Sequence, residues 1–480
     1  MNLRTVSRLT SHLLFLVAFF QLAPLGLGVA DTNLRAVLAY GGSVVVTGLL
    51  AALLRLLGRG AEVVHRADAL GVVALTWLLL GVVGGLPFVL EGSITHPASA
   101  AFEAVSGFTT TGATVVADVE ALSRATNLWR CEMHWFGGMG IVVLFVAVFP
   151  HLGVGAKHLF KTEVPGPITE GLRPKIKHTA LVLWWVYAGM TVACTGLLLA
   201  AGMPVFDAVC HAMSTLGTGG FSPKVASVGH YHSAVVDWIV FAFMMFAGLN
   251  FALYYQVLRG RPLDLWRNYE VRFYLGANVA LVLVVFLSIL DRHPDGLTAL
   301  RFAAFQTASV TTTTGFMTED FDTYPDLVRY LLVLAMFMGG CAGSTAGGLK
   351  ASRVFALFKL AGRELSNVIH PGVVVPVRLG GARLEPAVVS GISVYFATYL
   401  LIFAAAAIVL VALGLDLVSA TTAVVACLSS IGPGLGKVGP AQNYEFIPAI
   451  GKVVLTFCMI AGRLEIFALL AVFSPECWRR

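Results

Sequence analysis

The chain has 480 residues, of which 58% are hydrophobic and only 12% are charged, and its formal net charge is +6. An ordinary soluble domain has about 25% charged residues, so this composition excludes a soluble globular protein. The seven cysteines show no paired spacing, which indicates neither a disulfide framework nor a zinc site.

Uncharged apolar runs of about 20 residues, the length that crosses a ~30 Å hydrocarbon core as a helix, fill the chain. Ten candidate spans are Leu9 to Ala30, Ala36 to Leu54, Ala69 to Leu90, Met133 to Ala156, Thr179 to Phe206, Trp238 to Leu258, Phe273 to Leu290, Tyr330 to Leu349, Pro386 to Leu415, and Val453 to Pro475, the last interrupted by Arg463 and Glu465. The first run resembles a cleaved signal peptide, but its length and the close second span favour a membrane anchor. Lys and Arg gather on one side of this arrangement, which accounts for the positive charge without nucleic acid and predicts that both termini are cytoplasmic.

After the first two spans, the order span, short apolar stretch, span occurs four times. The short stretches run from Pro97 to Thr114, Pro204 to Ser222, Leu297 to Met317 and Asp416 to Leu435. Each is too short to cross and return, so we predict re-entrant loops, whose irregular backbone requires surrounding protein or a water-filled cavity. The predicted fold is an all-α integral membrane protein with four pseudo-fourfold units around a central ion pore. The expected units are residues 1–66 (two N-terminal helices), 67–160, 161–264, 265–372 (with a broken second span) and 373–480.

Each short stretch ends in a segment rich in Thr, Ser and Gly that contains one recurring glycine. The segments are Thr109 to Thr114, Leu216 to Phe221, Thr312 to Met317 and Ser429 to Gly434, and the glycines are Gly112, Gly219, Gly315 and Gly432. Glycine reaches backbone angles closed to other residues, so four such strands offer stacked carbonyl oxygens. Carbonyl rings of this kind replace the water shell of potassium, and the ends of the half-helices add attraction for a cation. Close packing between membrane helices is the competing interpretation, which four recurrences at matched positions disfavour.

At these segments the chain resembles the Trk/Ktr/HKT superfamily of potassium transporters, and the Trk branch in particular. The resemblance extends over nearly the whole chain and includes Trp135 to Gly140, Pro165 to Pro167, Gly339 to Lys350, and Gly462 to Glu465. It implies a homodimer in the bacterial cytoplasmic membrane with one pore per subunit. It also implies potassium as the transported ion, no bound organic cofactor, and a cytosolic nucleotide-binding regulatory partner of the TrkA type.

The resemblance places the potassium ligands at main-chain carbonyls of the two residues before each recurring glycine. These are Thr110, Thr111, Gly217, Thr218, Thr313, Thr314, Ser430 and Ile431. A glycine at the recurring position of all four segments resembles the potassium-selective members of the superfamily. Sodium-selective plant relatives carry Ser at this position in the first segment. The chain departs from the family at Ser430-Ile431, where Asn-Leu is frequent, and we expect a small effect because backbone oxygens bind the ion.

Five glycines lie in the ten residues from Gly339 to Gly348. Each interior glycine costs a helix about 1 kcal/mol relative to Ala, so we predict a broken helix with a loop beneath the filters. The resemblance assigns this loop as a gate, formed by Gly339, Gly340, Gly343, Ser344, Thr345, Gly347 and Gly348. A glycine packing face is the alternative.

Arg463 lies within the last span, where a charge is expensive and generally faces a bundle interior or a water-filled cavity. We hypothesise that it faces the pore below the filters as an electrostatic barrier. The alternative is an arginine paired with a neighbouring helix or with loop carbonyls.

Other charged and titratable residues allow two interpretations each. The acidic Glu319, Asp320, Asp322 and Asp326 form either a cation-concentrating vestibule or a solvated loop. His134 and His211 are expected to make structural hydrogen bonds rather than to bind metal. The basic stretches Lys157 to Lys177 and Lys350 to Arg383 are candidate docking surfaces for the regulator, although topology alone explains them.

Two other functions compete with a channel-like pore. An intramembrane enzyme would need a nucleophile with a base, or metal ligands, in facing spans, and the sequence has no HExxH, GxSxG or pair of span-centred Asp residues. A symporter that couples potassium to protons or sodium stays open, although few titratable groups lie in the spans. The sequence has no GxxxxGKS fingerprint, so we expect nucleotide-dependent regulation to come from a partner.

Overall fold

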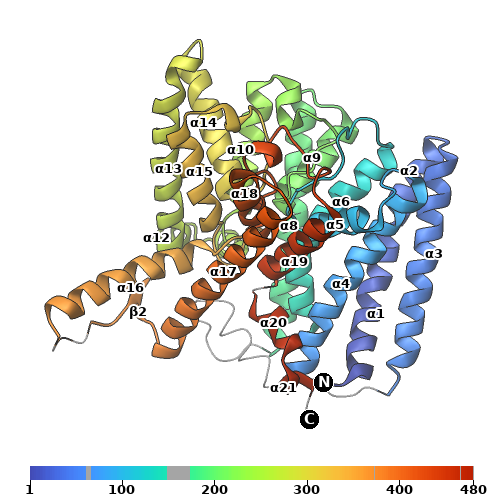
Figure 1. Cartoon of the computed structure of the whole chain (residues 1–480), viewed down its shortest axis with the longest axis horizontal. Helices are drawn as coiled ribbons and strands as arrows, with labels where there is room; N and C mark the ends of the chain where they lie inside the picture. Colours follow the sequence, from blue (N-terminus) through green and yellow to red (C-terminus); the bar gives the residue numbers. More distant parts are fainter. Residues whose placement is uncertain (61–65, 149–172, 372, 374, 465, 479–480) are drawn as a thin grey trace.

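The computed structural model describes every residue except 61–65, 149–172, 372, 374, 465 and 479–480. The described chain is almost wholly helical (Figure 1). It begins with α1 (Leu3–Phe20), α2 (Leu22–Ala30) and α3 (Leu34–Leu57). α1 and α2 follow one another as one apolar span, and α3 packs against both. Asn33 begins α3 because its side chain accepts a hydrogen bond from the Ala36 N–H at 3.2 Å.

A long helix, a short helix, an extended segment and a final helix then follow in this order four times. The long helices are α4 (Arg66–Glu91), α8 (Arg173–Ala200), α13 (Tyr269–Ile289) and α17 (Pro386–Ala412). The short helices are α5 (Pro97–Phe108), α9 (Val205–Gly217), α14 (Gly296–Thr311) and α18 (Leu417–Leu428). The final helices are α6 (Arg124–Val148), α10 (Ala234–Ala247) with α11 (Phe251–Leu258), α15 (Asp326–Met338) with α16 (Ala351–Ile369), and α19 (Ala449–Arg463) with α20 (Phe467–Phe473).

Short elements complete the described chain. They are η2 (Ser227–Tyr231), α12 (Leu263–Arg267), η3 (Leu290–Arg292), η4 (Phe321–Thr323), η5 (Gly436–Val438) and α21 (Pro475–Trp478). The strand β1 (Arg378–Leu379) pairs antiparallel with β2 (Ala382–Arg383) beside α16, which projects from the body of the molecule (Figure 1).

The four short helices are the half-length elements predicted from the sequence. They contain 12 to 16 residues. At a rise of about 1.5 Å per residue such helices reach roughly 18–24 Å, less than the ~30 Å hydrocarbon core. Their starts are well defined, because Pro97 occupies the first turn of α5 and the Asp295 and Asp416 carboxylates cap α14 and α18. Each is followed by extended backbone, as expected of a re-entrant loop.

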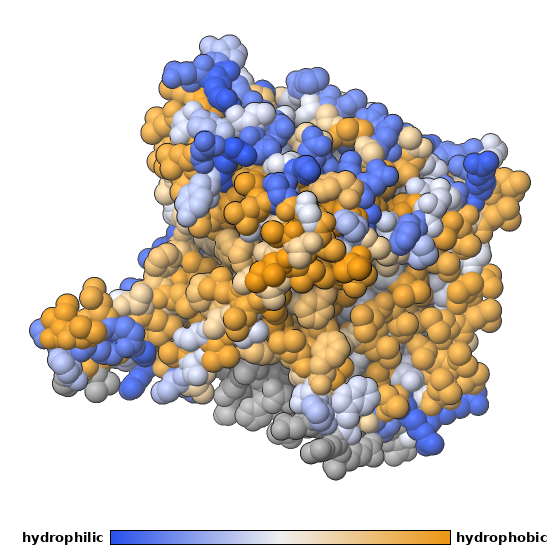
Figure 2. Space-filling model, in the orientation of Figure 1, coloured by the Kyte–Doolittle hydropathy of each residue, from blue (hydrophilic) through white to orange (hydrophobic). Residues whose placement is uncertain are grey.

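Within the described residues, six helices are long and apolar enough to cross a membrane, or eight if each of two bent helix pairs counts as one span. Figure 2 shows the matching surface, an apolar belt between polar ends. Four of the ten runs identified in the sequence are not single described helices, and two of the four are the bent pairs. α6 leaves the described residues after Val148, and the run from Tyr330 to Leu349 is interrupted because α15 ends at Met338.

The candidate span from Trp238 to Leu258 forms two helices rather than one. α10 and α11 meet at an angle of 96°. The new helix begins at Asn250, whose side chain accepts a hydrogen bond from the Ala252 N–H at 2.8 Å.

The two ends of the described chain lie at the same end of the molecule (Figure 1). The Met1 ammonium donates a hydrogen bond to the Cys477 carbonyl at 3.1 Å. Both ends of the described chain therefore lie on one side of the apolar belt.

Candidate ion pathway

Each short helix ends in the same backbone turn, at a residue with left-handed angles. These left-handed residues are Thr110, Thr218, Thr313 and Ser430, with φ of 55°, 52°, 56° and 57°. The next N–H reaches back to a carbonyl five residues earlier in all four, as Thr111 does to Ser106 at 2.8 Å and Thr314 to Ser309 at 2.9 Å. This turn normally uses glycine, and a β-branched residue in it is a rare conformation that the surroundings must hold in place.

Two residues after each left-handed residue stands a glycine that also has positive φ. These ring glycines are Gly112, Gly220, Gly315 and Gly432, with φ of 80°, 80°, 78° and 95°. We call the five residues from each left-handed residue onward a filter strand, which gives residues 110–114, 218–222, 313–317 and 430–434.

The four filter strands touch one another in a closed cycle. A Cβ atom added at Gly112 would overlap the Gly219 carbonyl oxygen, and one at Gly220 would overlap that of Thr314. In the same way Gly315 faces the Ile431 carbonyl, and Gly432 faces that of Thr111. Each strand therefore brings the carbonyl before its ring glycine against the next strand, and the fourth strand contacts the first. Only glycine leaves room for this approach.

The second filter strand is shifted by one residue from the assignment made on the sequence. Gly220, not Gly219, occupies the position of Gly112, and Gly219 supplies the contacting carbonyl. Gly217 is the last residue of α9 and packs against the His134 carbonyl of α6 instead. The three glycines of this segment hid the register, although Gly220-Phe221 repeats the Gly315-Phe316 pair.

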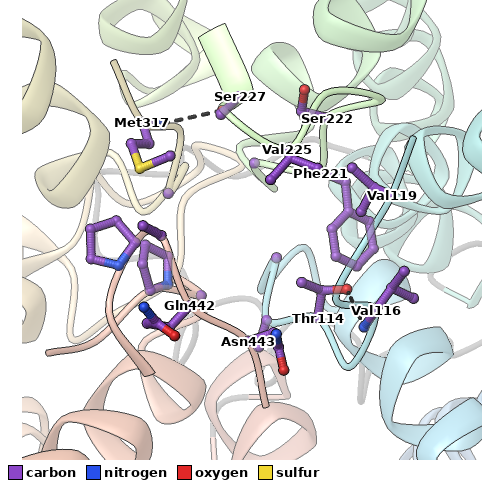
Figure 3. A pocket seen from close by; sticks show the side chains of 18 of the residues that line it. Thr114, Val116, Val119, Phe221, Ser222, Val225, Ser227, Met317, Gln442 and Asn443 are labelled. Atoms are coloured by element: carbon purple, nitrogen blue, oxygen red, sulfur yellow. Dashed lines mark hydrogen bonds between the residues drawn. The ribbon is translucent and has the colours of Figure 1, made fainter. Parts of the chain in front are cut away.

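The filter strands open into a cavity of about 110 Å³, which we call the mouth cavity. All four ring glycines line it, together with the segment from Gly439 to Tyr444. Figure 3 shows Thr114, Phe221, Met317 and Gln442 around its open centre. The only charged residues in its described lining are Arg130 and Lys224. The four acidic residues considered for a vestibule are not in that lining, and Asp322, for example, pairs with Arg329 at 2.8 Å.

The predicted break of the helix is present between Met338 and Ala351, and we call residues 339–350 the gate loop. The Cys341 N–H donates to the Gly248 carbonyl at 2.9 Å, and the Phe251 N–H donates to the Gly343 carbonyl at 3.1 Å. The buried Glu270 carboxylate holds both ends, accepting from Ala342 at 2.7 Å and from Ser352 at 3.0 Å.

The gate loop also contacts the start of two filter strands. The Gly347 N–H donates to the Thr313 hydroxyl at 2.7 Å, and a Cβ at Gly347 would overlap the Ser429 carbonyl. The third and fourth strands thus begin at the gate loop and lead to the mouth cavity.

Arg463 is buried and bonds to carbonyls, which is the alternative considered for it. Its guanidinium donates to the Thr345 carbonyl of the gate loop at 2.7 Å and to the Gly137 carbonyl of α6 at 3.0 Å. Gly137 in turn packs against the last turn of α5, at the Phe108 carbonyl. Arg463 therefore ties the gate loop to the helix that supports the first filter strand.

The family described as "TrkH: Cation transport protein" matches residues 43–479. The chain belongs to the TrkH family. The Trk system potassium uptake protein TrkH of Salmonella typhimurium is 40% identical over 85% of both chains, and that of Halomonas elongata is 37% identical over the whole of both. The crystal structure of the potassium transporter TrkH from Vibrio parahaemolyticus superposes with a TM-score of 0.89 over the full length of both chains at 35% identity.

Membership of the TrkH family and the apolar helices together establish a multi-pass membrane protein. The members named above are potassium transporters and not enzymes. The motif from Pro165 to Pro167, Glu465 and most of the stretch from Lys157 to Lys177 lie outside the described residues.

Two buried residues beside the filter strands of this TrkH-family chain were missed in the sequence. Arg130 in α6 and Glu103 in α5 form an ion pair at 2.8 Å. Arg130 was overlooked because the candidate span was drawn from Met133, whereas α6 already begins at Arg124.

The two histidines make the structural hydrogen bonds predicted for them. The His134 Nδ1 atom lies 3.3 Å from the Ser214 hydroxyl, and the His211 Nε2 atom lies 3.1 Å from the Ser222 hydroxyl. The described residues contain no group of three His, Cys, Asp or Glu side chains able to hold a metal ion.

Proposed function

We propose that this chain takes up potassium ions through a channel-like path along the four filter strands. The observation that carries the proposal is the closed cycle in which each ring glycine faces a carbonyl of the next strand. Four backbone strands around one axis supply main-chain oxygens that substitute for the ion's hydration shell. The relatives named above as potassium uptake proteins support potassium as the ion.

The proposed ligands are the carbonyls of the left-handed residue and the residue after it in each strand. With the register of the structure these are Thr110, Thr111, Thr218, Gly219, Thr313, Thr314, Ser430 and Ile431. The short helices end next to these residues and direct the negative ends of their dipoles toward the cation. Potassium is the substrate, and the proposal includes no organic cofactor and no enzymatic reaction.

The gate loop is the proposed barrier to flow, held in place by Arg463 and Glu270. Its contacts with Thr313 and Ser429 are the support for this role, because movement of the loop necessarily alters the start of two filter strands. A regulator that moves the loop would break these bonds and so change the flux.

The proposed setting is a Trk-type system in the bacterial cytoplasmic membrane. The names of the relatives refer to a Trk system, which supports a partnership with a cytosolic nucleotide-binding subunit of the TrkA type. A homodimer with one pore per subunit, and termini on the cytoplasmic side, complete the proposal. The basic residues from Lys350 to Arg383 support this orientation.

Ion flux in reconstituted proteoliposomes tests the proposal. We expect the purified protein to take up rubidium and potassium in preference to sodium, with a reversal potential that follows the potassium gradient alone. A reversal potential that also follows pH or sodium would establish coupled symport instead. Absence of rubidium uptake by a folded protein, with and without the regulatory subunit, would refute the proposal.

A further inference from the structure

In each of the first three units, the side chain seven residues before the left-handed residue bonds to the last residue of the filter strand or to a residue just after it. Glu103 accepts hydrogen bonds from the Thr114 hydroxyl at 2.9 Å and the Val115 N–H at 2.8 Å. His211 bonds to the Ser222 hydroxyl at 3.1 Å, and Gln306 donates to the Glu319 carbonyl at 2.7 Å.

In the fourth unit this position is Ala423, and its neighbour Thr422 replaces it. The Thr422 hydroxyl accepts from the Leu435 N–H at 3.0 Å. We call Glu103, His211, Gln306 and Thr422 the struts. They make the four short helices rigid supports for the end of each strand that faces the mouth cavity.

Only the first strut is a carboxylate with a buried cationic partner. The side chains of Arg130 and Glu103 are 1% and 0% exposed, and their Nε and Oε1 atoms are 2.8 Å apart. Both oxygens of Glu103 and all three guanidinium nitrogens of Arg130 have protein partners. Apolar residues often replace a buried ion pair without loss of stability. Stability alone therefore does not explain why this pair is present.

Arg130 connects the first filter strand to the second. It donates to the Thr114 hydroxyl at 3.1 Å and to the Ser222 carbonyl at 3.4 Å. Thr114 and Ser222 occupy equivalent positions, two residues after their ring glycines, and both line the mouth cavity (Figure 3). Through Ser222 the network continues to the second strut, His211.

The Arg130 guanidinium also stacks on a ring of the second filter strand, which adds to the link between the first two strands. The Arg130 guanidinium lies 4.1 Å from the centre of the Phe221 ring, whose other neighbour is the His134 ring at 4.1 Å. Phe221 directly follows the ring glycine Gly220. The guanidinium is planar and has five donors, so it holds several acceptors and a ring face at once, which an ammonium group does not.

We propose that Arg130 and Glu103 are positioning residues for ion selection, because they fix the distance between the first two filter strands at the mouth cavity. This inference rests on the proposed function. Neither side chain contacts the ion in it. The pair keeps the first two strands from relaxing around the smaller sodium ion, and discrimination between ions falls when the pair is broken.

The test compares rubidium with sodium uptake in proteoliposomes for Glu103→Gln, Arg130→Met, Arg130→Lys and the double variant E103L/R130M. Glu103→Gln keeps an acceptor for Thr114 but leaves Arg130 uncompensated. The double variant removes both charges and is expected to fold, since apolar pairs tolerate such sites. We expect the ratio of rubidium to sodium uptake to fall roughly ten-fold in Glu103→Gln, Arg130→Met and the double variant. This is the factor that the loss of one charged hydrogen bond produces. Arg130→Lys should keep part of the ratio of rubidium to sodium uptake, because it keeps the charge but has fewer donors.

The ion pair of Asp237 and Arg301, at 3.3 Å between α10 and α14, supplies the matched control. Neither residue lines the mouth cavity, so D237N/R301M should lower the thermal stability without changing the ratio. An unchanged ratio in the double variant, or an equal fall in the control, would overturn the inference. Rubidium uptake by the unmodified protein separates this outcome from failure of the proposed function, in which no preparation would transport the ion.

Discussion

The Gly347 N–H of the gate loop donates a hydrogen bond to the Thr313 hydroxyl, 2.7 Å away, at the beginning of the third filter strand. The hydroxyls at the equivalent positions Thr110 and Ser430 have no protein partner, and that of Thr218 donates to the Gly217 carbonyl beside it. The third strand is therefore the one whose left-handed residue is bonded to the gate loop. This bond links the loop that is proposed to close the path with the backbone that is proposed to select the ion.

Thr313→Val is expected to raise rubidium uptake in the absence of the regulatory subunit. The substitution keeps the shape of the side chain but leaves the buried Gly347 N–H without an acceptor, at a cost of about 1–3 kcal/mol to the closed position of the loop. Uptake by proteoliposomes without the regulator should increase roughly ten-fold.

Thr313→Ser is the matched control, because it keeps the hydroxyl and because Ser430 shows that serine adopts the same left-handed angles. Thr110→Val makes the same change at a hydroxyl without a protein partner and should not share the increase. Equal uptake by all three variants would show that the bond does not restrain the loop.

Arg463→Met should also raise uptake without the regulator. The variant loses two charge-assisted hydrogen bonds, to the Thr345 and Gly137 carbonyls, so the gate loop is no longer tied to α6. Arg463→Lys keeps the charge but reaches fewer carbonyls and should give an intermediate value. If the Met and Lys variants express normally and transport like the unmodified protein, Arg463 neither holds the gate loop against α6 nor blocks ions electrostatically.

Gly315→Ala is expected to abolish selective transport. Its Cβ would overlap the Ile431 carbonyl oxygen, and φ of 78° is unfavourable for alanine. Gly276→Ala, in the same unit, is the control, because nothing lies within 4 Å of its Cβ in α13. That variant should transport normally and gain up to about 1 kcal/mol of helix stability. Selective rubidium uptake by the Gly315 variant would contradict the packing of the ring.

The start of α18 should become less stable in acid. Hydrogen bonds from the Ser419 backbone and side chain lower the pKa of Asp416. A lowered pKa in the folded state gives stability that is complete above the unfolded value of about 3.9 and is lost as the pH falls through the folded pKa. Asp416→Asn keeps a cap without this titration. The unmodified protein should therefore unfold at a higher temperature than the Asn variant at pH 7, and the difference should shrink below about pH 4. A difference independent of pH would contradict this.

The sequence was sufficient to predict the half-helices, the filter segments and the broken helix before Ala351. Those features follow from composition and from glycine placement, which act locally. The bend at Asn250 also had a local signal, a helix-capping Asn after Gly248, that was masked by the apolar run around it.

The register of the second strand and the struts required spatial information. The Gly220-Phe221 pair was a weak signal in a segment with three glycines. The positive φ of Gly220 and its approach to the Thr314 carbonyl identify it as the ring glycine. Glu103 and Arg130 lie 27 residues apart, and no periodicity in the sequence indicates that their side chains meet. Arg463 was identified by its cost in a membrane, but its carbonyl partners come from two other units of the chain.

The left-handed residues have a consequence for how the protein assembles. Three are threonines, and each such conformation costs roughly 1–2 kcal/mol when nothing compensates it. Each turn is bonded to its own short helix, but the ring glycine two residues later packs against the next strand, so one strand alone lacks that support. A polypeptide interrupted before the fourth unit would thus have three relaxed segments rather than three quarters of a binding site, and the path should form in a single cooperative step when the last unit inserts.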